Sequence, residues 1–378
     1  MKSLAAICWG VNQPWTVEEI EVDPPGPGEV LVEWAAAGLC HSDEGIRTGE
    51  RVPKEEEPKR FPMLGGHEGA GVVADVGPGV TAFSPGDHVL ANFVPACGRC
   101  RYCATGRGYI CDDNKGFAER GQLVDGQIKH RARGQDLFVM AKLGTFAERT
   151  VVSQRSLLPL DSDLPLASTS LVSCGVTTGW GSAVGRGGTK PGDIVVVVGT
   201  GGVGFGAVQG ARIAGAKHII AVDLIENRRE MALKGGATST AASIADARDE
   251  VAHLTNGQGA DVVVLTPSVV TGQLIHDALG ITGKGGTCVV TGMAEHGVQP
   301  VPMDIGMFAL YNKQLLGCLF GSMDPRSSAP RLLGLYRNGL LDLDVMVTRY
   351  PLPDINEALA DSNEGRNIRG VLTMNGLN

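Results

Sequence analysis

The chain has 378 residues, which is enough for two domains of ordinary size. Hydrophobic residues make up 43% and charged residues 20%, as in a globular protein rather than a disordered one. The net charge of −8 and the lack of any block of Lys and Arg exclude nucleic acid as an expected partner. No run of eighteen apolar residues and no signal peptide are found, so we expect no membrane partner and a cytoplasmic location.

The first 175 residues contain short β-rich segments that Gly and Pro interrupt. Strands are predicted at 28–34, 68–76 and 87–91. Residues 51–60 are charged and bounded by proline, which is typical of a solvated surface loop.

Four cysteines then occur within fifteen residues, in the pattern C-x-x-C-x-x-C-x7-C: Cys97, Cys100, Cys103 and Cys111. This spacing suits a tetrahedral cage of thiolates around one zinc ion. A closed all-sulfur cage has no open coordination position, so its role would be to hold a lobe at 95–113 together. Two disulfides are the alternative, but nine cysteines is an odd number and no secretory signal is present, so zinc is favoured.

From about residue 190, apolar strands alternate with helices, which is typical of a parallel sheet covered on both faces. The predicted strands are 194–198, 219–223, 261–266 and 287–292, and the predicted helices are 202–214, 226–235, 246–255 and 271–280. Residues 331–338 are predicted as a later helix and 369–374 as a closing strand. Residues 314–321 are apolar enough to form a sheet edge that pairs with another subunit.

The strand at 194–198 leads into Gly199-Thr200-Gly201-Gly202-Val203-Gly204, a G-x-G-x-x-G motif in its required strand-to-helix setting. Gly199 would make the tight turn, Gly201 would let a pyrophosphate approach the backbone, and Gly204 would allow close packing of the helix on the strand. Nineteen residues after Gly204, Asp223 ends the next strand. A carboxylate there can bind the ribose 2′-OH and would repel a 2′-phosphate, so NAD is favoured over NADP.

Three further motifs lie far apart in the sequence: Cys40-His41-Ser42-Asp43, Gly65-Gly66-His67-Glu68 and Ser173-Cys174-Gly175. Each is ambiguous alone, because a single His or Cys is more often a core residue than a ligand. Together with the four-cysteine cluster, the glycine motif and residues 367–370 (Asn-Ile-Arg-Gly), they resemble the zinc-containing alcohol dehydrogenases of the medium-chain dehydrogenase/reductase superfamily. The resemblance extends over essentially the whole chain.

The resemblance implies two zinc ions per subunit, one structural and one catalytic, with Cys40, His67 and Cys174 as ligands of the catalytic ion. Two thiolates and one imidazole leave a fourth position open, and a zinc ion there would lower the pKa of a bound alcohol. Asp43 and Glu68 would then orient His67 and tune the charge of the metal. Ser42 matches the hydroxyl that accepts the proton of the alcohol. The family often continues this relay to a histidine at a position that Gly45 occupies here, so the path of the proton to solvent is left open.

The resemblance also assigns residues to NAD. His41 and Arg369 match positions that contact the pyrophosphate, and Arg228 matches the basic residue near the adenosine ribose. Thr178 and Val203 match positions packed against the nicotinamide. Three apolar residues are candidates for the wall of the substrate pocket: Phe93, Met293 and Met307.

The implied fold class is α/β, with a β-rich GroES-like catalytic domain and a Rossmann domain that has a doubly wound parallel sheet. The implied boundaries are 1–175 with 320–378 for the catalytic domain and 176–319 for the Rossmann domain, and the active site would lie between the two. The resemblance also implies that the chain forms a homodimer or a homotetramer.

The implied function is reversible oxidation of alcohols to aldehydes or ketones by hydride transfer to NAD. Residues 133–136, 144–146 and 175–181 resemble the actinobacterial nicotinoprotein branch, whose members keep NAD bound and are assayed with a nitroso-aniline as external electron acceptor. Two alternatives remain open. One is a glutathione-dependent formaldehyde dehydrogenase, and the other is a non-catalytic nucleotide-binding relative, against which the presence of Cys40, His67 and Cys174 argues.

Overall fold

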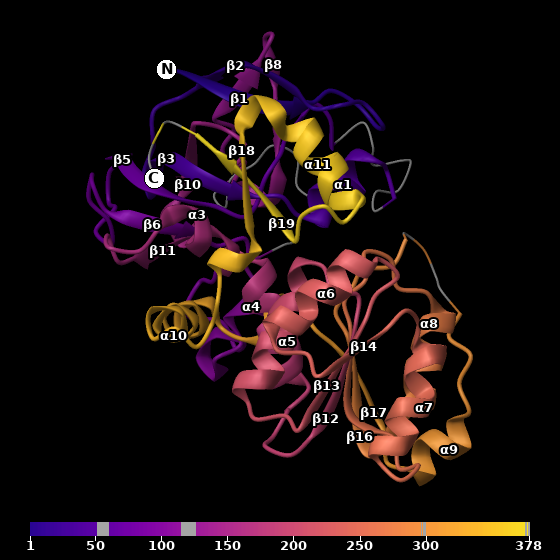
Figure 1. Ribbon diagram of the computed structural model, residues 1–378. Helices are drawn as coiled ribbons and strands as arrows, with labels where there is room; N and C mark the ends of the chain where they lie inside the picture. The colour runs from indigo at the N-terminus through magenta and orange to yellow at the C-terminus, as the bar shows by residue number, and fades with distance from the viewer. Residues whose placement is uncertain (51–59, 115–125, 296, 298–299, 375, 377–378) are drawn as a thin grey trace.

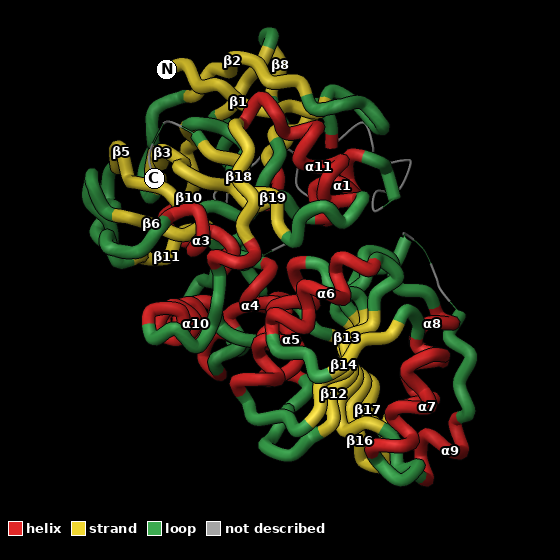
Figure 2. The backbone as a smooth tube through the Cα atoms, viewed as in Figure 1, coloured by secondary structure: helices red, strands yellow, loops and turns green. Residues whose placement is uncertain are grey.

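The computed structural model describes residues 1–50, 60–114, 126–295, 297, 300–374 and 376. The predicted loop at 51–60 therefore lies, except for Arg60, outside the described residues. The described strands form three sheets. Two of these sheets make up a β-rich half of the molecule, and a parallel sheet flanked by helices makes up the other half (Figure 1 and Figure 2).

The β-rich half combines segments from both ends of the chain. One sheet has the order β8 (Gln135–Asp136), β7 (His130–Ala132), β2 (Thr16–Val22), β1 (Lys2–Cys8), β4 (Met63–Leu64) and β9 (Phe138–Val139). The other has the order β11 (Leu157–Leu160), β6 (His88–Ala91), β5 (Ala70–Val76), β3 (Glu29–Gly38), β19 (Arg369–Thr373) and β18 (Val347–Pro351), with β10 (Arg149–Ser153) also on β3. In this sheet Val371 of β19 lies opposite Gly38 of β3, which brings Arg369 close to the segment that follows β3.

The parallel sheet has the order β14 (Ser239–Ala241), β13 (His218–Val222), β12 (Ile194–Val198), β15 (Ala260–Leu265), β16 (Thr282–Val290) and β17 (Gln314–Gly317). Its continuous apolar strands are buried because helices cover both faces. Figure 1 shows α4 (Gly175–Trp180), α5 (Gly202–Ile213) and α6 (Glu226–Gly235) on one face and α7 (Ile244–Leu254), α8 (Gly272–Ile281) and α9 (Ile305–Leu310) on the other. This arrangement confirms the predicted fold class.

Two predicted elements begin earlier than expected. The helix predicted at 331–338 is α10, which spans Pro325–Arg337. Asp324 accepts a hydrogen bond from the Arg326 N–H and caps the start of the helix, which continues through Pro330. The strand predicted at 287–292 is β16, which begins at Thr282.

Among the described residues, the β-rich half also contains α1 (His41–Arg47), α11 (Ile355–Asn363) and a single turn at α3 (Leu166–Thr169). No helix among the described residues is both long enough and apolar enough to cross a membrane. The domain boundaries given above remain a prediction.

Candidate active site

A cavity of about 980 Å³ lies between the two halves of the molecule. Its walls include Cys40, His41, Ser42, His67, Phe93, Cys174, Thr178, Gly199, Gly201, Gly202, Val203, Asp223, Arg228 and Arg369. These residues come from segments more than 300 positions apart. The fold thus places the three scattered motifs and the glycine motif around one space.

The residues expected to hold a catalytic zinc lie together at one part of this cavity. The ligand atoms of Cys40, His67, Glu68 and Cys174 are all within 4.8 Å of one another. Cys40 follows β3 and precedes α1, His67 and Glu68 lie between β4 and β5, and Cys174 precedes α4. All four side chains are at least nine-tenths buried. Three segments far apart in the sequence therefore have to meet to assemble this cluster.

The Asp43 carboxylate fixes the orientation of the His67 ring. Its Nδ1 lies 2.9 Å from Asp43 Oδ2, and Asp43 Oδ1 accepts a hydrogen bond of 2.8 Å from the Gly66 N–H. Because Nδ1 faces a carboxylate, this nitrogen carries the proton and Nε2 is left as the metal-binding atom. Asp43 is 1% exposed, so its charge acts on His67 with little screening by water.

The donor set fits a zinc ion. A hydrogen bond from Cys174 lowers the pKa of Cys40 well below its ordinary value; burial opposes this shift, and the charge of His67 adds to it. Cys40 therefore favours the thiolate form, which is the form that binds metal. Burial raises the pKa of Glu68 to about 7, although its ion pair with Arg369 opposes the rise. The ion pair holds Glu68 beside the cluster.

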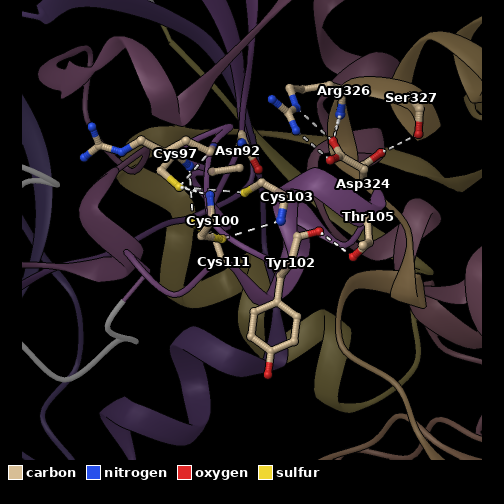
Figure 3. Close-up of polar contacts among 12 residues, drawn as sticks. Asn92, Cys97, Cys100, Tyr102, Cys103, Thr105, Cys111, Asp324, Arg326 and Ser327 are labelled. Atoms are coloured by element: carbon tan, nitrogen blue, oxygen red, sulfur yellow. Dashed lines mark hydrogen bonds and ion pairs between the residues drawn. The ribbon is translucent and has the colours of Figure 1, made fainter.

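The four-cysteine cluster is a separate site on the β-rich half (Figure 3). The Sγ atoms of Cys97 and Cys103 are 3.9 Å apart, and those of Cys100 and Cys111 are 3.8 Å apart. A tetrahedron with Zn–S bonds of about 2.3 Å has edges of about 3.8 Å, so these distances fit one zinc ion. A disulfide would need an S–S distance of about 2.0 Å. All nine cysteines are free, so the disulfide alternative is excluded.

Backbone N–H groups donate hydrogen bonds to the sulfur atoms of this cluster. The N–H of Cys100 donates to Cys97 Sγ over 3.3 Å, and the N–H of Cys97 donates to Cys111 Sγ over 3.2 Å. Hydrogen bonds from the N–H groups of Cys103 and Asp112 lower the pKa of Cys100 to about 6. The Cys100 thiolate is thus stabilised before any zinc ion binds, whereas burial raises the pKa of Cys103 to about 12.

The lobe that carries this cluster is attached to the start of α10. The Asp324 carboxylate accepts hydrogen bonds from Arg326 Nε (3.0 Å) and Nη2 (2.8 Å). A Cβ atom on Gly108 would lie only 2.5 Å from Asp324 Oδ2, which shows how closely the lobe approaches this carboxylate. Figure 3 shows the Asp324 and Arg326 side chains next to the cysteines.

The glycine motif forms the turn between β12 and α5. Gly199 has a φ of +84°, a conformation that a side chain would strain. A Cβ atom on Gly204 would lie 1.9 Å from the Gly199 carbonyl oxygen, whereas one on Gly201 would have no neighbour within 4 Å. Gly204 therefore permits the tight packing of helix on strand, and Gly201 faces open space at the N-terminus of α5. Such a turn can accept a pyrophosphate.

Asp223 and Arg228 lie at the carboxyl end of the neighbouring strand. Asp223 is 8% exposed and accepts hydrogen bonds from the Thr200 N–H (2.7 Å) and the Ile225 N–H (2.9 Å). Arg228 Nη2 donates to the Ser362 carbonyl over 2.6 Å, and its buried Nε has no hydrogen-bond partner among the described residues. An NAD ribose beside Asp223 fits these groups.

Two family models match the chain. Residues 26–162 match the alcohol dehydrogenase GroES-like domain, and residues 202–337 match the zinc-binding dehydrogenase domain. The chain is also 47% identical to the NDMA-dependent alcohol dehydrogenase of Amycolatopsis methanolica, with 98% of this chain and 99% of that protein aligned. The chain belongs to the zinc-binding alcohol dehydrogenase family.

Other members of the family support this assignment. Alcohol dehydrogenase B of Mycobacterium tuberculosis is 43% identical over 98% of both chains. Among solved structures, an alcohol dehydrogenase zinc-binding domain protein from Burkholderia ambifaria superposes with a TM-score of 0.90 at 31% identity, covering 99% of each chain. Benzyl alcohol dehydrogenase of Acinetobacter calcoaceticus gives 0.89 at 26% identity, covering 99% of this chain and 100% of that one. The protein is an oxidoreductase with catalytic and structural zinc sites and an NAD(H) site, as predicted.

The apolar wall of this dehydrogenase differs in part from the prediction. Phe93 and Met293 line the cavity, but Met307 lies on α9 and does not, so that prediction is wrong. Phe93 packs edge-on against His67 and against Phe320, with ring centroids 5.5 Å and 5.0 Å apart. Phe320 was not predicted as part of this wall, because Phe320 lies far from Phe93 in the sequence and belongs to no motif.

Asp223→Gly is expected to weaken NAD binding roughly 10- to 100-fold, since hydrogen bonds to a charged group each contribute about 1.5–3 kcal/mol. The same change should relax the exclusion of NADP, because the opposing charge is gone. Equilibrium binding of both cofactors measures the effect. Asp223→Asn is the matched control, because it removes the charge but keeps an oxygen acceptor. An unchanged ratio of the two affinities in Asp223→Gly would contradict the role of Asp223.

Proposed function

We propose that this enzyme oxidises alcohols to aldehydes or ketones by hydride transfer to an NAD molecule that stays bound between turnovers. The observation that carries the proposal is the single cavity that joins the Cys40, His67 and Cys174 cluster to the glycine motif. A zinc ion held by these three side chains would supply a Lewis acid that lowers the pKa of the alcohol. An NAD molecule held at the glycine motif would supply the hydride acceptor.

The side chains of the protein orient the ligands of the catalytic zinc and accept the proton of the alcohol. Asp43 holds His67 in one tautomer, and the aromatic rings of Phe93 and Phe320 shield the cluster from water. The Ser42 hydroxyl lies 3.8 Å from Cys40 Sγ on the cavity wall, where it can take the proton of the alcohol. We propose Thr178 and Val203 as the surface behind the nicotinamide, and His41, Gly202 and Arg369 as contacts of the pyrophosphate, since all five line the same cavity.

Tight retention of NAD is supported by the similarity to the NDMA-dependent enzyme of Amycolatopsis methanolica over nearly the whole chain. An enzyme that keeps its cofactor needs an external electron acceptor to return the bound NADH to NAD. An aldehyde or an artificial acceptor that enters the same cavity can be this electron acceptor, because hydride transfer is reversible. A homo-oligomer joined at the edge strand β17 and a cytoplasmic location remain predictions.

The test is the cofactor content of the protein as purified without added NAD. After denaturation, we expect close to one NAD(H) per chain in the supernatant, and turnover of alcohols that depends on an acceptor such as a nitroso-aniline. S-hydroxymethylglutathione is tested separately, because turnover of this substrate would indicate a glutathione-dependent formaldehyde dehydrogenase. Cofactor-free protein that turns over steadily with added NAD would show that the cofactor exchanges, while still supporting alcohol oxidation.

A further inference from the structure

Two hydrogen bonds beside the cofactor cavity connect the two halves of the molecule and have no part in the reaction. On one side is the start of α6, directly after Asp223; on the other is the turn between α11 and β19 (Figure 1). Asn227 Nδ2 donates to the Gly365 carbonyl over 2.6 Å, and Arg228 Nη2 donates to the Ser362 carbonyl over 2.6 Å. These bonds join the two halves of the molecule at the part of the cavity where Asp223 lies.

The turn that receives these bonds is shaped for close contact. Gly365 is buried and has a φ of +72°, and a Cβ atom on it would lie 2.7 Å from Ile225 Cγ2. A residue with a side chain would therefore be strained and would also push the turn away from α6. Glycine at this position allows the main chain of the β-rich half to rest directly on the first turn of α6.

Each side of this junction is braced within its own half. On the side of the turn, Asn367 Nδ2 donates to the Tyr350 hydroxyl (3.1 Å), and that hydroxyl donates to Asp361 Oδ2 (2.6 Å). On the other side, the Thr200 N–H donates to Asp223, and the Thr200 hydroxyl lies 3.4 Å from the Arg228 carbonyl oxygen. Hydrogen bonds therefore support the junction on both sides, and on one side they connect α6 to the glycine motif that would hold the pyrophosphate.

We propose that Asn227, Arg228, Ser362 and Gly365 form a latch that controls how fast NAD leaves the cavity. The latch stands beside Asp223, where the adenosine ribose would bind, and Ser362 and Arg228 both line the cavity. Separating the halves to release a dinucleotide requires both hydrogen bonds to break. The inference rests on the proposed function, because it gives a physical reason for slow exchange of NAD, but its prediction concerns the rate of release and applies to a freely exchanging cofactor as well.

Asn227 is the residue that tests the latch most directly. It does not line the cavity and its side chain is exposed, so Asn227→Ala removes one hydrogen bond of the latch without touching the cofactor. Arg228 is less suitable because it also faces the ribose position. Glu230 lies on the exposed surface of the same helix and provides the matched control Glu230→Ala.

The experiment follows the exchange of bound NAD(H) against isotopically labelled NAD by rapid gel filtration, using the full-length, zinc-loaded enzyme. Asn227→Ala is expected to release NAD roughly three- to tenfold faster than the wild type, Gly365→Ala at least as fast, and Glu230→Ala at the wild-type rate. The unfolding temperature of the cofactor-free protein should not change in Asn227→Ala, because a general loss of stability would lower it.

The outcomes separate the two proposals. Wild-type release that is slow and is not accelerated by Asn227→Ala would overturn the latch and leave tight binding of NAD intact. Wild-type release that is fast, yet is accelerated further by Asn227→Ala alone, would overturn tight binding and support the latch. Equal acceleration by Glu230→Ala would show that any change on α6 has the same effect, which also overturns the latch.

Discussion

Cys174→Ser is expected to reduce turnover of alcohols about a thousandfold or more while leaving the fold in place. The substitution removes one thiolate from the Cys40, His67 and Cys174 cluster, and a Lewis acid at this site contributes several kcal/mol to the stabilisation of charge in the transition state. Metal analysis should find one zinc per chain in place of two. Thermal unfolding should change little, because the four-cysteine lobe keeps its own ion.

The matched control is Cys8→Ser. Cys8 is buried like Cys174 but lies outside both clusters, and its thiol donates to the Gly10 carbonyl, which a serine hydroxyl can also reach. This variant should keep both zinc ions and its activity. If Cys174→Ser retained two zinc ions and wild-type turnover, the catalytic cluster would be assigned incorrectly.

Cys100→Ser should lose the other zinc ion and much of the stability of the lobe at 95–113. Structural zinc ions can contribute more than about 10 kcal/mol to the folding of small domains. The loss should extend to the start of α10, because Asp324 packs against Gly108 of the lobe. Thermal unfolding, zinc content and limited proteolysis of the lobe measure the effect.

The comparison of Cys100→Ser with Cys174→Ser separates structure from catalysis. The first variant is expected to lower the unfolding temperature strongly and the second to lower turnover strongly. A Cys100→Ser protein that is as stable as the wild type and holds two zinc ions would disprove the structural role of the lobe.

Much of this protein could be predicted from local sequence. The four cysteines from Cys97 to Cys111 are close together in the chain, and their spacing with the odd number of cysteines favoured a zinc cage over two disulfides. The glycine motif and Asp223 are likewise a local unit, because one strand, one turn and one helix place all their groups. The parallel sheet could also be predicted, because the alternation of apolar strands and helices is visible in consecutive segments of the sequence.

Groups that meet across the chain were determined by the tertiary structure. Spacing alone does not bring Cys40, His67 and Cys174 together, because they lie in three distant segments beside β3, β4 and α4. Only the resemblance to a family suggested this set beforehand. Phe320 beside Phe93 and Asn227 against Gly365 carry no sequence signal at all. Both contacts join residues more than a hundred positions apart, so they depend on how distant segments of the chain pack together.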